Sequence, residues 1–186
     1  MERRTWLQGL FAAVASTAIG REATAATKSA PKELEVQKNW RMLLAQGVQP
    51  PSPTEKLKLS NDEWRKRLDK MQYYVLREEG TERAGTSPLD AEKRAGVFAC
   101  AGCDLPLFTS DMKFDSGTGW PSFFTMIPGV FETKTDYHLI YPRTEYHCTR
   151  CGGHHGHVFE DGPKPTGLRY CNNGVALKFI PKSAKA

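Results

Sequence analysis

Five cysteines set the strongest limit on what this 186-residue chain can fold into. Four of them form two C-x-x-C pairs, Cys100 with Cys103 and Cys148 with Cys151. Two such pairs predict a tetrahedral site of four thiolates for structural zinc, Zn(2+), with no open position for catalysis. Neighbouring glycines permit the tight turns that this chelation needs. Two disulfides are the alternative in an oxidising compartment, but a spacing of two residues suits chelation or redox chemistry better than cross-linking a fold.

Cys171 is the fifth cysteine and stands outside this pattern. A free cysteine is commonly a buried core residue, and that alternative stays open. Residues 168–179 are expected to form a strand, on which Arg169, Cys171 and Asn173 share one face. Positive neighbours favour the thiolate, which is the nucleophilic form of cysteine. Cys171 is therefore a candidate nucleophile in a polar cleft.

Histidines upstream of this strand supply an acid–base group. His154 and His157 lie in a turn-rich segment that is expected to fold back towards Cys171. Histidine transfers protons near neutral pH, and Asp161 is a candidate to orient one ring or to stabilise a charge. Each histidine alone is more typical of a polar surface, but two of them beside a solitary cysteine indicate catalysis. The remaining histidines have weaker cases: His138, His147 and His155.

The chain divides into a leader, an arm, a domain and a tail. Residues 1–26 are typical of a targeting peptide, because paired arginines precede an apolar run and a small-residue cleavage site. The arginine pair favours a bacterial twin-arginine signal over a general secretory one, so an exported, periplasmic or secreted protein is expected. An untargeted amphipathic start is the alternative. Residues 27–59 form a polar, proline-rich arm, residues 60–181 the domain, and residues 182–186 the tail.

The domain is expected to be β-rich α+β, with small antiparallel sheets in an open, barrel-like arrangement. Ser60 and Glu63 predict a capping box that starts one N-terminal helix. The apolar stripe of that helix is expected to enter the core: Trp64, Leu68, Met71 and Val75. Residues 32–45 carry a weaker helical pattern. Short strands are predicted at 97–100, 105–108, 138–141, 144–147 and 168–179.

Charge and hydropathy argue against two classes of partner. The net charge is +5, but the basic residues form neither a long run nor a stripe with aromatic residues, so we expect no nucleic acid. No stretch of the mature domain is long and apolar enough to span a bilayer. Once the leader is removed, no stable membrane association is expected.

Two segments together resemble methionine-R-sulfoxide reductases of the B type. They are G-T-G-W-P-S-F at residues 117–123 and the run of residues 148–179 with its cysteine pair, histidines and R-Y-C-N-N. The resemblance covers residues 60–179 and implies an antiparallel β fold with zinc away from the active site. It implies these site residues: Cys171 as nucleophile, His154, His157 and Asn173 lining the site, Trp120 as the wall for the substrate methyl group, and Asp161 from the same motif.

The resemblance also implies a reaction. Methionine R-sulfoxide, in oxidised proteins or peptides and also free, is reduced to methionine through a Cys171 sulfenic acid, with His157 as the preferred proton donor. Many relatives carry a resolving cysteine where this chain has Thr118. Since four cysteines are assigned to zinc, an external thiol reductant, thioredoxin-like or a small thiol, is expected to regenerate Cys171.

Two other functions stay open at this point. A non-enzymatic zinc-ribbon-like module would bind nucleic acid or protein without needing Cys171, and it predicts a basic and aromatic stripe. A Cys-His hydrolase would use Cys171 on a carbonyl, but the sequence contains no obvious oxyanion-hole loop. Incubation with methionine sulfoxide and a dithiol separates all three functions.

Overall fold

The computed structural model describes residues 34–44, 48–137 and 141–182. The predicted leader, the start of the arm and residues 183–186 of the tail lie outside the described residues. The helical elements are α1 (Glu35–Lys38), η1 (Trp40–Leu43), α2 (Asn61–Arg67), α3 (Lys70–Glu78), η2 (Ser110–Met112) and η3 (Gly174–Ala176), the η elements being single 3-10 turns. The strands are β1 (Gly96–Cys100), β2 (Pro106–Thr109), β3 (Lys113–Phe114), β4 (Ser122–Phe123), β5 (Phe131–Asp136), β6 (Arg143–Cys148), β7 (His154–Phe159), β8 (Arg169–Asn172) and β9 (Leu177–Pro181).

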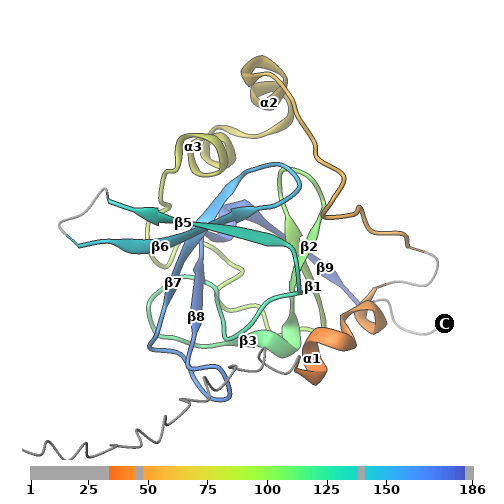
Figure 1. Cartoon of the computed structure of the whole chain (residues 1–186), viewed down its shortest axis with the longest axis vertical. Coiled ribbons are helices and arrows are strands. Elements are labelled where there is room, and N and C mark those ends of the chain that lie inside the picture. Colours follow the sequence, from red (N-terminus) through yellow and green to blue (C-terminus); the bar gives the residue numbers. More distant parts are fainter. Residues whose placement is uncertain (1–33, 45–47, 138–140, 183–186) are drawn as a thin grey trace, which may run out of the picture. The chain divides into compact units, whose positions relative to one another are not determined.

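The strands form two antiparallel sheets, which confirms the predicted β-rich architecture. One sheet has the order β2-β1-β9, and the other has the order β3-β4-β8-β7-β6-β5. Figure 1 shows α2 and α3 together at one end of this domain, where α3 packs against β7 and η3. Strands β7 and β8 lie in the middle of the larger sheet, so residues on them are held from both sides.

Aromatic side chains join the two sheets into one core. Phe108 of β2 stacks on Phe123 of β4, with ring centroids 3.9 Å apart, and Phe98 of β1 meets the edge of the same ring at 5.1 Å. All three side chains are fully buried. Aromatic rings bury large apolar areas, so this contact is a main source of cohesion between the sheets.

The predicted N-terminal helix is two helices. The capping box of Ser60 and Glu63 is present and starts α2. The helix ends at Arg67, however, because Asp69 caps a new helix by accepting a hydrogen bond from the backbone N–H of Gln72 at 2.8 Å. The break resets the helical register. Met71, predicted to be in the core, is therefore 43% exposed.

The predicted strand at residues 168–179 is wrong as a single element. Strand β8 ends at Asn172, η3 follows, and β9 belongs to the other sheet. The backbone N–H groups of Gly174 and Val175 both donate to the Glu82 carboxylate, and this turns the chain out of the sheet. Asn173 consequently lies beyond β8 and does not share the strand face of Arg169 and Cys171.

Other strand predictions succeed in part. The predictions at 97–100, 105–108 and 144–147 are confirmed by β1, β2 and β6. Strands β5 and β7 were not predicted, and β7 occupies the segment that was expected to be a turn-rich loop. Of the predicted strand at 138–141, residues 138–140 lie outside the described residues, and Tyr141 is exposed and not in a strand.

The described part of the arm contacts the domain. The predicted helix at 32–45 is reduced to α1 and η1. The Gln37 side chain donates to Thr125 Oγ1 at 3.0 Å and to the Met126 carbonyl at 3.1 Å, and the Leu57 N–H donates to the Arg150 carbonyl at 2.7 Å. Within the described residues, every helix is too short or too polar to cross a membrane.

Candidate active site and metal centre

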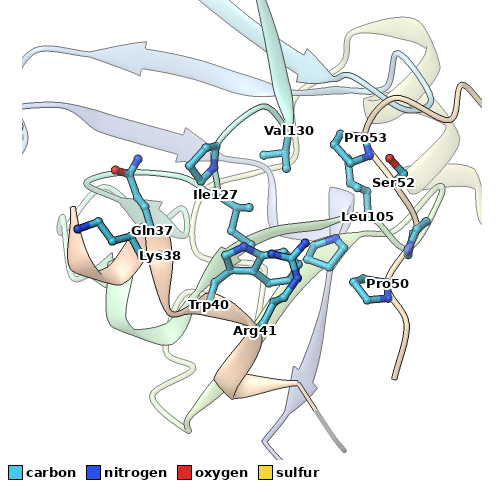
Figure 2. Close-up of a pocket in the computed structure, with 13 residues that line it drawn as sticks. Gln37, Lys38, Trp40, Arg41, Pro50, Ser52, Pro53, Leu105, Ile127 and Val130 are labelled. Atoms are coloured by element: carbon cyan, nitrogen blue, oxygen red, sulfur yellow. The ribbon is translucent and has the colours of Figure 1, made fainter. Parts of the chain in front are cut away.

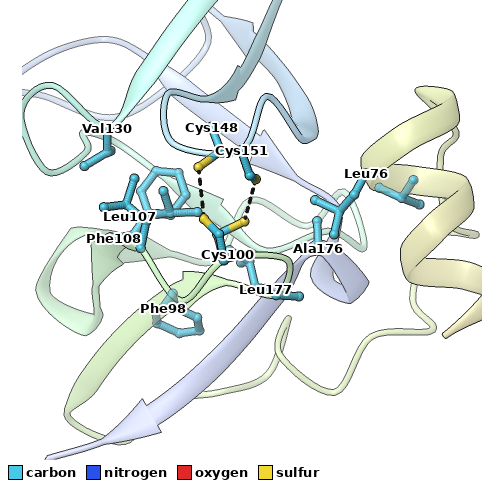
Figure 3. Packing of buried hydrophobic residues seen from close by; sticks show 14 of the residues in the cluster. Leu76, Phe98, Cys100, Leu107, Phe108, Val130, Cys148, Cys151, Ala176 and Leu177 are labelled. Carbon is cyan, nitrogen blue, oxygen red and sulfur yellow. Dashed lines mark hydrogen bonds between the residues drawn. The ribbon is translucent and has the colours of Figure 1, made fainter. Parts of the chain in front are cut away.

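The four cysteines of the C-x-x-C pairs meet in one buried cluster (Figure 3). Their sulfur atoms all lie within 4.8 Å of one another, with 3.7 Å between Cys100 and Cys151 and 3.6 Å between Cys103 and Cys148. Four thiolates at about 2.3 Å from one tetrahedral zinc ion would be about 3.8 Å apart. A disulfide requires about 2.05 Å between sulfurs. The donor set therefore fits a four-thiolate metal ion and does not fit two disulfides.

Arginines hold the two loops that carry these cysteines. Arg67 donates to the Gly102 carbonyl at 2.7 Å, Arg77 to the Cys151 carbonyl at 2.9 Å, and Arg150 to the Cys103 carbonyl at 2.9 Å. Four thiolates around a divalent ion carry a net charge of about −2, which nearby guanidinium groups offset. The surroundings thus suit the same metal ion as the sulfur geometry does.

A separate cluster of polar side chains surrounds Cys171 on β8. Cys171 is half-buried and pairs across the sheet with His157 of β7 on one side and Ser122 of β4 on the other. It opens into a cavity of about 120 Å³. The cavity is lined by Thr81, Trp120, Arg143, Gly156, His157, Phe159, Cys171, Asn172 and Asn173. No cysteine of the four-cysteine cluster is among these residues, so this cavity is separate from that cluster.

His157 is held in place by an acid that the sequence analysis missed. The His157 Nε2 atom lies 2.7 Å from Oδ2 of Asp136 on β5, and Arg143 of β6 donates to the same oxygen at 2.6 Å. A carboxylate only accepts, so Nε2 carries the proton and Nδ1 is the nitrogen that can exchange one. Burial lowers the pKa of His157, while the bond to Asp136 opposes that shift.

The thiol of Cys171 is influenced by an arginine and a hydroxyl group. Burial raises the pKa of Cys171, whereas the Arg169 guanidinium and a hydrogen bond with the Thr118 side chain lower it. Arg169 in turn donates two hydrogen bonds to Asp161, both at 2.8 Å, and stacks over Phe159 at 4.4 Å. Asp161 thus faces Arg169, and its negative charge raises the pKa of Cys171.

The other predicted site residues occupy different positions around this cavity. His154 is buried beside Glu145, with 2.7 Å between Nδ1 and Oε1, and its ring lies 5.6 Å from that of His157 behind the cavity wall. Asn173 and Trp120 line the cavity. Both also contact Glu82: Asn173 Oδ1 accepts from its N–H at 2.9 Å, and Trp120 Nε1 donates to its carbonyl at 3.2 Å.

Asp136, Arg143 and Glu82 belong to no sequence motif, so the sequence alone did not mark them. Asp136 and Arg143 face each other only because β5 and β6 pair in that register. A hairpin predicted over residues 131–148 would have placed both together, but the polar sequence of β5 hides the strand. Glu82 lies in a segment without helix or strand, where neither spacing nor periodicity marks a functional residue.

A larger cavity lies elsewhere in the described part of the chain. It measures about 520 Å³ and lies between the arm and the domain, where Trp40 and Arg41 face Leu105 and Ile127 (Figure 2). The Arg41 guanidinium stacks over Trp40 at 4.5 Å. The residues that line this cavity include no cysteine and no histidine.

The domain that holds both clusters is similar to proteins of known function. Residues 68–181 match the family model described as the SelR domain. The chain is 52% identical over 133 residues to peptide methionine sulfoxide reductase B1, chloroplastic, of Arabidopsis thaliana, and the alignment covers 71% of this chain and 66% of that protein.

Bacterial relatives are covered more completely. Peptide methionine sulfoxide reductase MsrB of Pseudomonas putida is 52% identical over 130 residues, which cover 69% of this chain and 97% of that protein. MsrB of Agrobacterium fabrum is 50% identical over 127 residues, which cover 68% of this chain and 94% of that protein. By contrast, the chain spans 66% and 60% of the two plant proteins that it matches.

Proposed function

The chain belongs to the SelR domain family of peptide methionine sulfoxide reductases, and we propose that it reduces methionine R-sulfoxide to methionine through Cys171. The observation that carries this proposal is the pairing of a half-buried thiol with His157 across β7 and β8, at a cavity walled by Trp120. A zinc-ribbon-like binding module is not favoured, because such a module has no use for this thiol and its acid–base partner.

The reaction transfers one oxygen atom. The Cys171 sulfur attacks the sulfoxide sulfur, and the oxygen passes to the cysteine, so that thiol and sulfoxide give sulfenic acid and thioether. The methionine sulfur is reduced by two electrons, and the cysteine sulfur is oxidised by two. The thiol proton reaches the moving oxygen through Nδ1 of His157, while Asp136 and Arg143 keep the ring in place.

The cavity walls account for the choice of substrate. Trp120 provides an apolar surface for the methyl group on sulfur, and Asn173 and Arg143 line the polar side. A chiral sulfur that places its methyl group on Trp120 directs its oxygen towards His157 in only one epimer. The cavity of about 120 Å³ accommodates the end of a side chain, which suits methionine sulfoxide in an unfolded or exposed segment of an oxidised protein.

The direct test compares the two epimers. We expect the wild-type protein with a dithiol to consume methionine R-sulfoxide, free or in a peptide, and to leave the S epimer untouched. Chiral chromatography of the products measures this. If a folded, metal-loaded protein consumes neither epimer, the proposal fails, and consumption of the S epimer alone would place the enzyme in another class.

The pH profile of kcat/KM should be a broad plateau. The Cys171 thiol with a neutral His157 and the Cys171 thiolate with a protonated His157 contain the same number of protons. The reactive protonation state is therefore populated at every pH between the pKa values of these two groups. Burial lowers the pKa of His157 and raises that of Cys171. The plateau should therefore extend from below about pH 6.5 to above about pH 8.5, the ordinary values of the two groups.

Two variants should each move one limb of that profile. Asp136→Asn replaces the charged acceptor that raises the pKa of His157 with a neutral amide, so the acid limb should shift to lower pH. Arg169→Met removes the charge that lowers the pKa of Cys171, so the alkaline limb should shift to higher pH. Steady-state rates from about pH 5 to 10, together with alkylation rates of Cys171, measure both. The assignment is wrong if either variant moves the opposite limb.

Regeneration of Cys171 is proposed to use an external thiol. Two thiols reduce the sulfenic acid to Cys171 and water and become a disulfide. Among the described cysteines, the others are buried in the metal cluster, and the side chains that hydrogen-bond to Cys171 are those of Thr118 and Arg169. One equivalent of substrate without reductant should leave a sulfenic acid that dimedone labels.

Thr118→Cys provides the matched variant for this step. A thiol introduced beside Cys171 should trap the sulfenic acid as a disulfide between Cys171 and the new side chain. Dimedone labelling should then be abolished, as mass spectrometry would show. In the wild-type protein, a disulfide between Cys171 and any of the four cluster cysteines, with release of metal, would overturn this account of regeneration.

We propose zinc as the metal of the four-cysteine cluster. Four soft thiolate donors at tetrahedral spacing suit Zn²⁺. Cys100, Cys103, Cys148 and Cys151 would hold the ion and fill every position, so that it links the turn after β1 to the turn after β6 and contributes stability without taking part in the reaction.

We also propose that residues 1–26 are an export signal of the twin-arginine type. The paired arginines, the apolar run and the small-residue cleavage site support this. The two plant relatives are named chloroplastic. Fusion of residues 1–40 to a reporter, with Arg3→Lys and Arg4→Lys as the control, tests whether the pair directs export.

A further inference from the structure

We propose that Glu82 is a positioning residue of the active site, which fixes Trp120 and Asn173 relative to Cys171. The proposal rests on the function proposed above. Glu82 belongs to the segment between α3 and β1, which contains no helix or strand among its described residues. It does not line the cavity, although the preceding residue, Thr81, does.

The backbone of Glu82 holds two walls of the cavity. Its N–H donates to Oδ1 of Asn173 at 2.9 Å, and its carbonyl accepts the indole N–H of Trp120 at 3.2 Å. The N–H and the carbonyl of this one residue therefore hold Asn173, on the polar wall, and Trp120, on the apolar wall, at a fixed separation. The neighbouring bond from the Gly85 N–H to the Gly119 carbonyl, at 2.7 Å, holds the segment against the turn that carries Trp120.

The side chain of Glu82 anchors this backbone to the 3-10 turn that follows the strand of the nucleophile. Its carboxylate accepts hydrogen bonds from the N–H of Gly174 and, at 3.0 Å, from that of Val175. Both donors lie in η3, which begins immediately after Asn173, and they are three and four residues beyond Cys171. A Cβ atom added to Gly174 would lie 1.9 Å from Oγ of Ser87, so the segment and the turn are in close contact.

Burial of the Glu82 carboxylate costs free energy, because a charged group is removed from water. Glu82 is only 2% exposed, and burial raises its pKa. An apolar residue of similar volume would pack there without the cost of removing a charge from water. The carboxylate instead matches two adjacent N–H donors with two oxygens, which makes the separation between the anchored segments specific. This arrangement indicates positioning in addition to packing.

Two substitutions separate the parts of this arrangement. Glu82→Gln keeps the length of the side chain but replaces one acceptor oxygen with an NH₂ group, so one of the two donors loses its partner. Glu82→Ala removes both bonds. Because displacement of site residues by about 1 Å costs about 10²-fold in rate, we expect kcat/KM for methionine R-sulfoxide to fall about 10²-fold in Glu82→Ala and less in Glu82→Gln.

The readouts distinguish positioning from a loss of stability. In Glu82→Ala we expect the preference for the R over the S epimer to narrow, while the alkylation rate of Cys171 by iodoacetamide stays within about twofold. Leu68→Ala is the matched control, because Leu68 is buried in the core and lies outside the cavity lining. It should lower the melting temperature without changing epimer preference.

Hydrogen exchange tests the anchor independently of activity. The amides of Gly174 and Val175 and the indole N–H of Trp120 should lose protection in Glu82→Ala, while the amides of β6 and β7 keep it. If Glu82→Ala loses amide protection but keeps its kcat/KM and its epimer preference, the positioning role is overturned. The same holds if, at equal melting temperature, Glu82→Ala loses no more activity than Leu68→Ala. If the wild-type protein reduces neither epimer, the proposed function fails. If hydrogen exchange at Gly174, Val175 and Trp120 is unchanged in Glu82→Ala, only the anchoring role of Glu82 is refuted.

Discussion

Cys171→Ser is expected to abolish the reduction of methionine R-sulfoxide while fold and metal content are retained. A serine hydroxyl is a far weaker nucleophile than a thiol and cannot carry the oxygen as a sulfenic acid. Loss of a catalytic nucleophile commonly lowers kcat by about 10⁴-fold or more, so activity should fall by at least that factor. Cys171 is half-buried beside polar groups, and oxygen replaces sulfur with little change in shape.

The controls for this variant are physical and chemical. Its melting temperature and its ratio of metal to protein should equal those of the wild-type protein, because Cys171 is outside the metal cluster. Glu78→Gln, an exposed change on α3, should keep full activity after the same preparation. A Cys171→Ser protein with wild-type turnover would refute the thiol mechanism.

His157→Ala should be less severe than loss of the nucleophile. Positioned proton transfer contributes roughly 10²–10⁴-fold, so a rate loss in that range is expected, without a change in dimedone labelling after long incubation with substrate. Asp136→Asn should lose less, because it leaves the imidazole in place and changes only its pKa and orientation. The order of the rate losses in Cys171→Ser, His157→Ala and Asp136→Asn tests the roles of nucleophile, proton donor and support of the proton donor.

Local sequence spacing predicted those parts of the fold that depend on neighbouring residues. Each C-x-x-C pair brings its own two sulfurs together in a turn, so the metal cluster required only that the two turns meet. The capping box of Ser60 and Glu63 likewise closes within one helical turn. Such features are set by a few consecutive residues, and the structure contains them where the pattern placed them.

Contacts between distant segments explain what the sequence did not reveal. The alternation of Arg169, Cys171 and Asn173 continues through residue 173, but the strand stops because Glu82, far upstream, binds the next two N–H groups. Tertiary contacts of this kind override a local strand pattern. Asp136 shows the same limit, since its partner His157 comes from a strand with which β5 does not pair directly.

Cys103→Ser and Cys151→Ser are each expected to lose the metal and to destabilise the whole domain. Structural zinc contributes about 10–16 kcal/mol in small zinc-finger peptides, whereas a domain is commonly stable by only about 5–15 kcal/mol. The four cysteines belong to the buried cluster that includes Leu76, Phe98 and Leu177 (Figure 3). Loss of the ion removes the link between the turn after β1 and the turn after β6, which belong to different sheets, so the damage should reach both sheets.

The comparison that isolates the metal uses Cys171→Ser beside Cys151→Ser. Both variants remove one thiol, but only the second removes a metal ligand, so only the second should lose zinc in elemental analysis and melt at a much lower temperature. Chelation of the wild-type protein should lower its melting temperature in parallel, and added zinc should restore both melting and activity. Because the ion would have no open position, restored activity should follow the folded fraction and leave the pH profile unchanged. A metal-free protein that melts and turns over like the wild type would show that the cluster does not stabilise the fold.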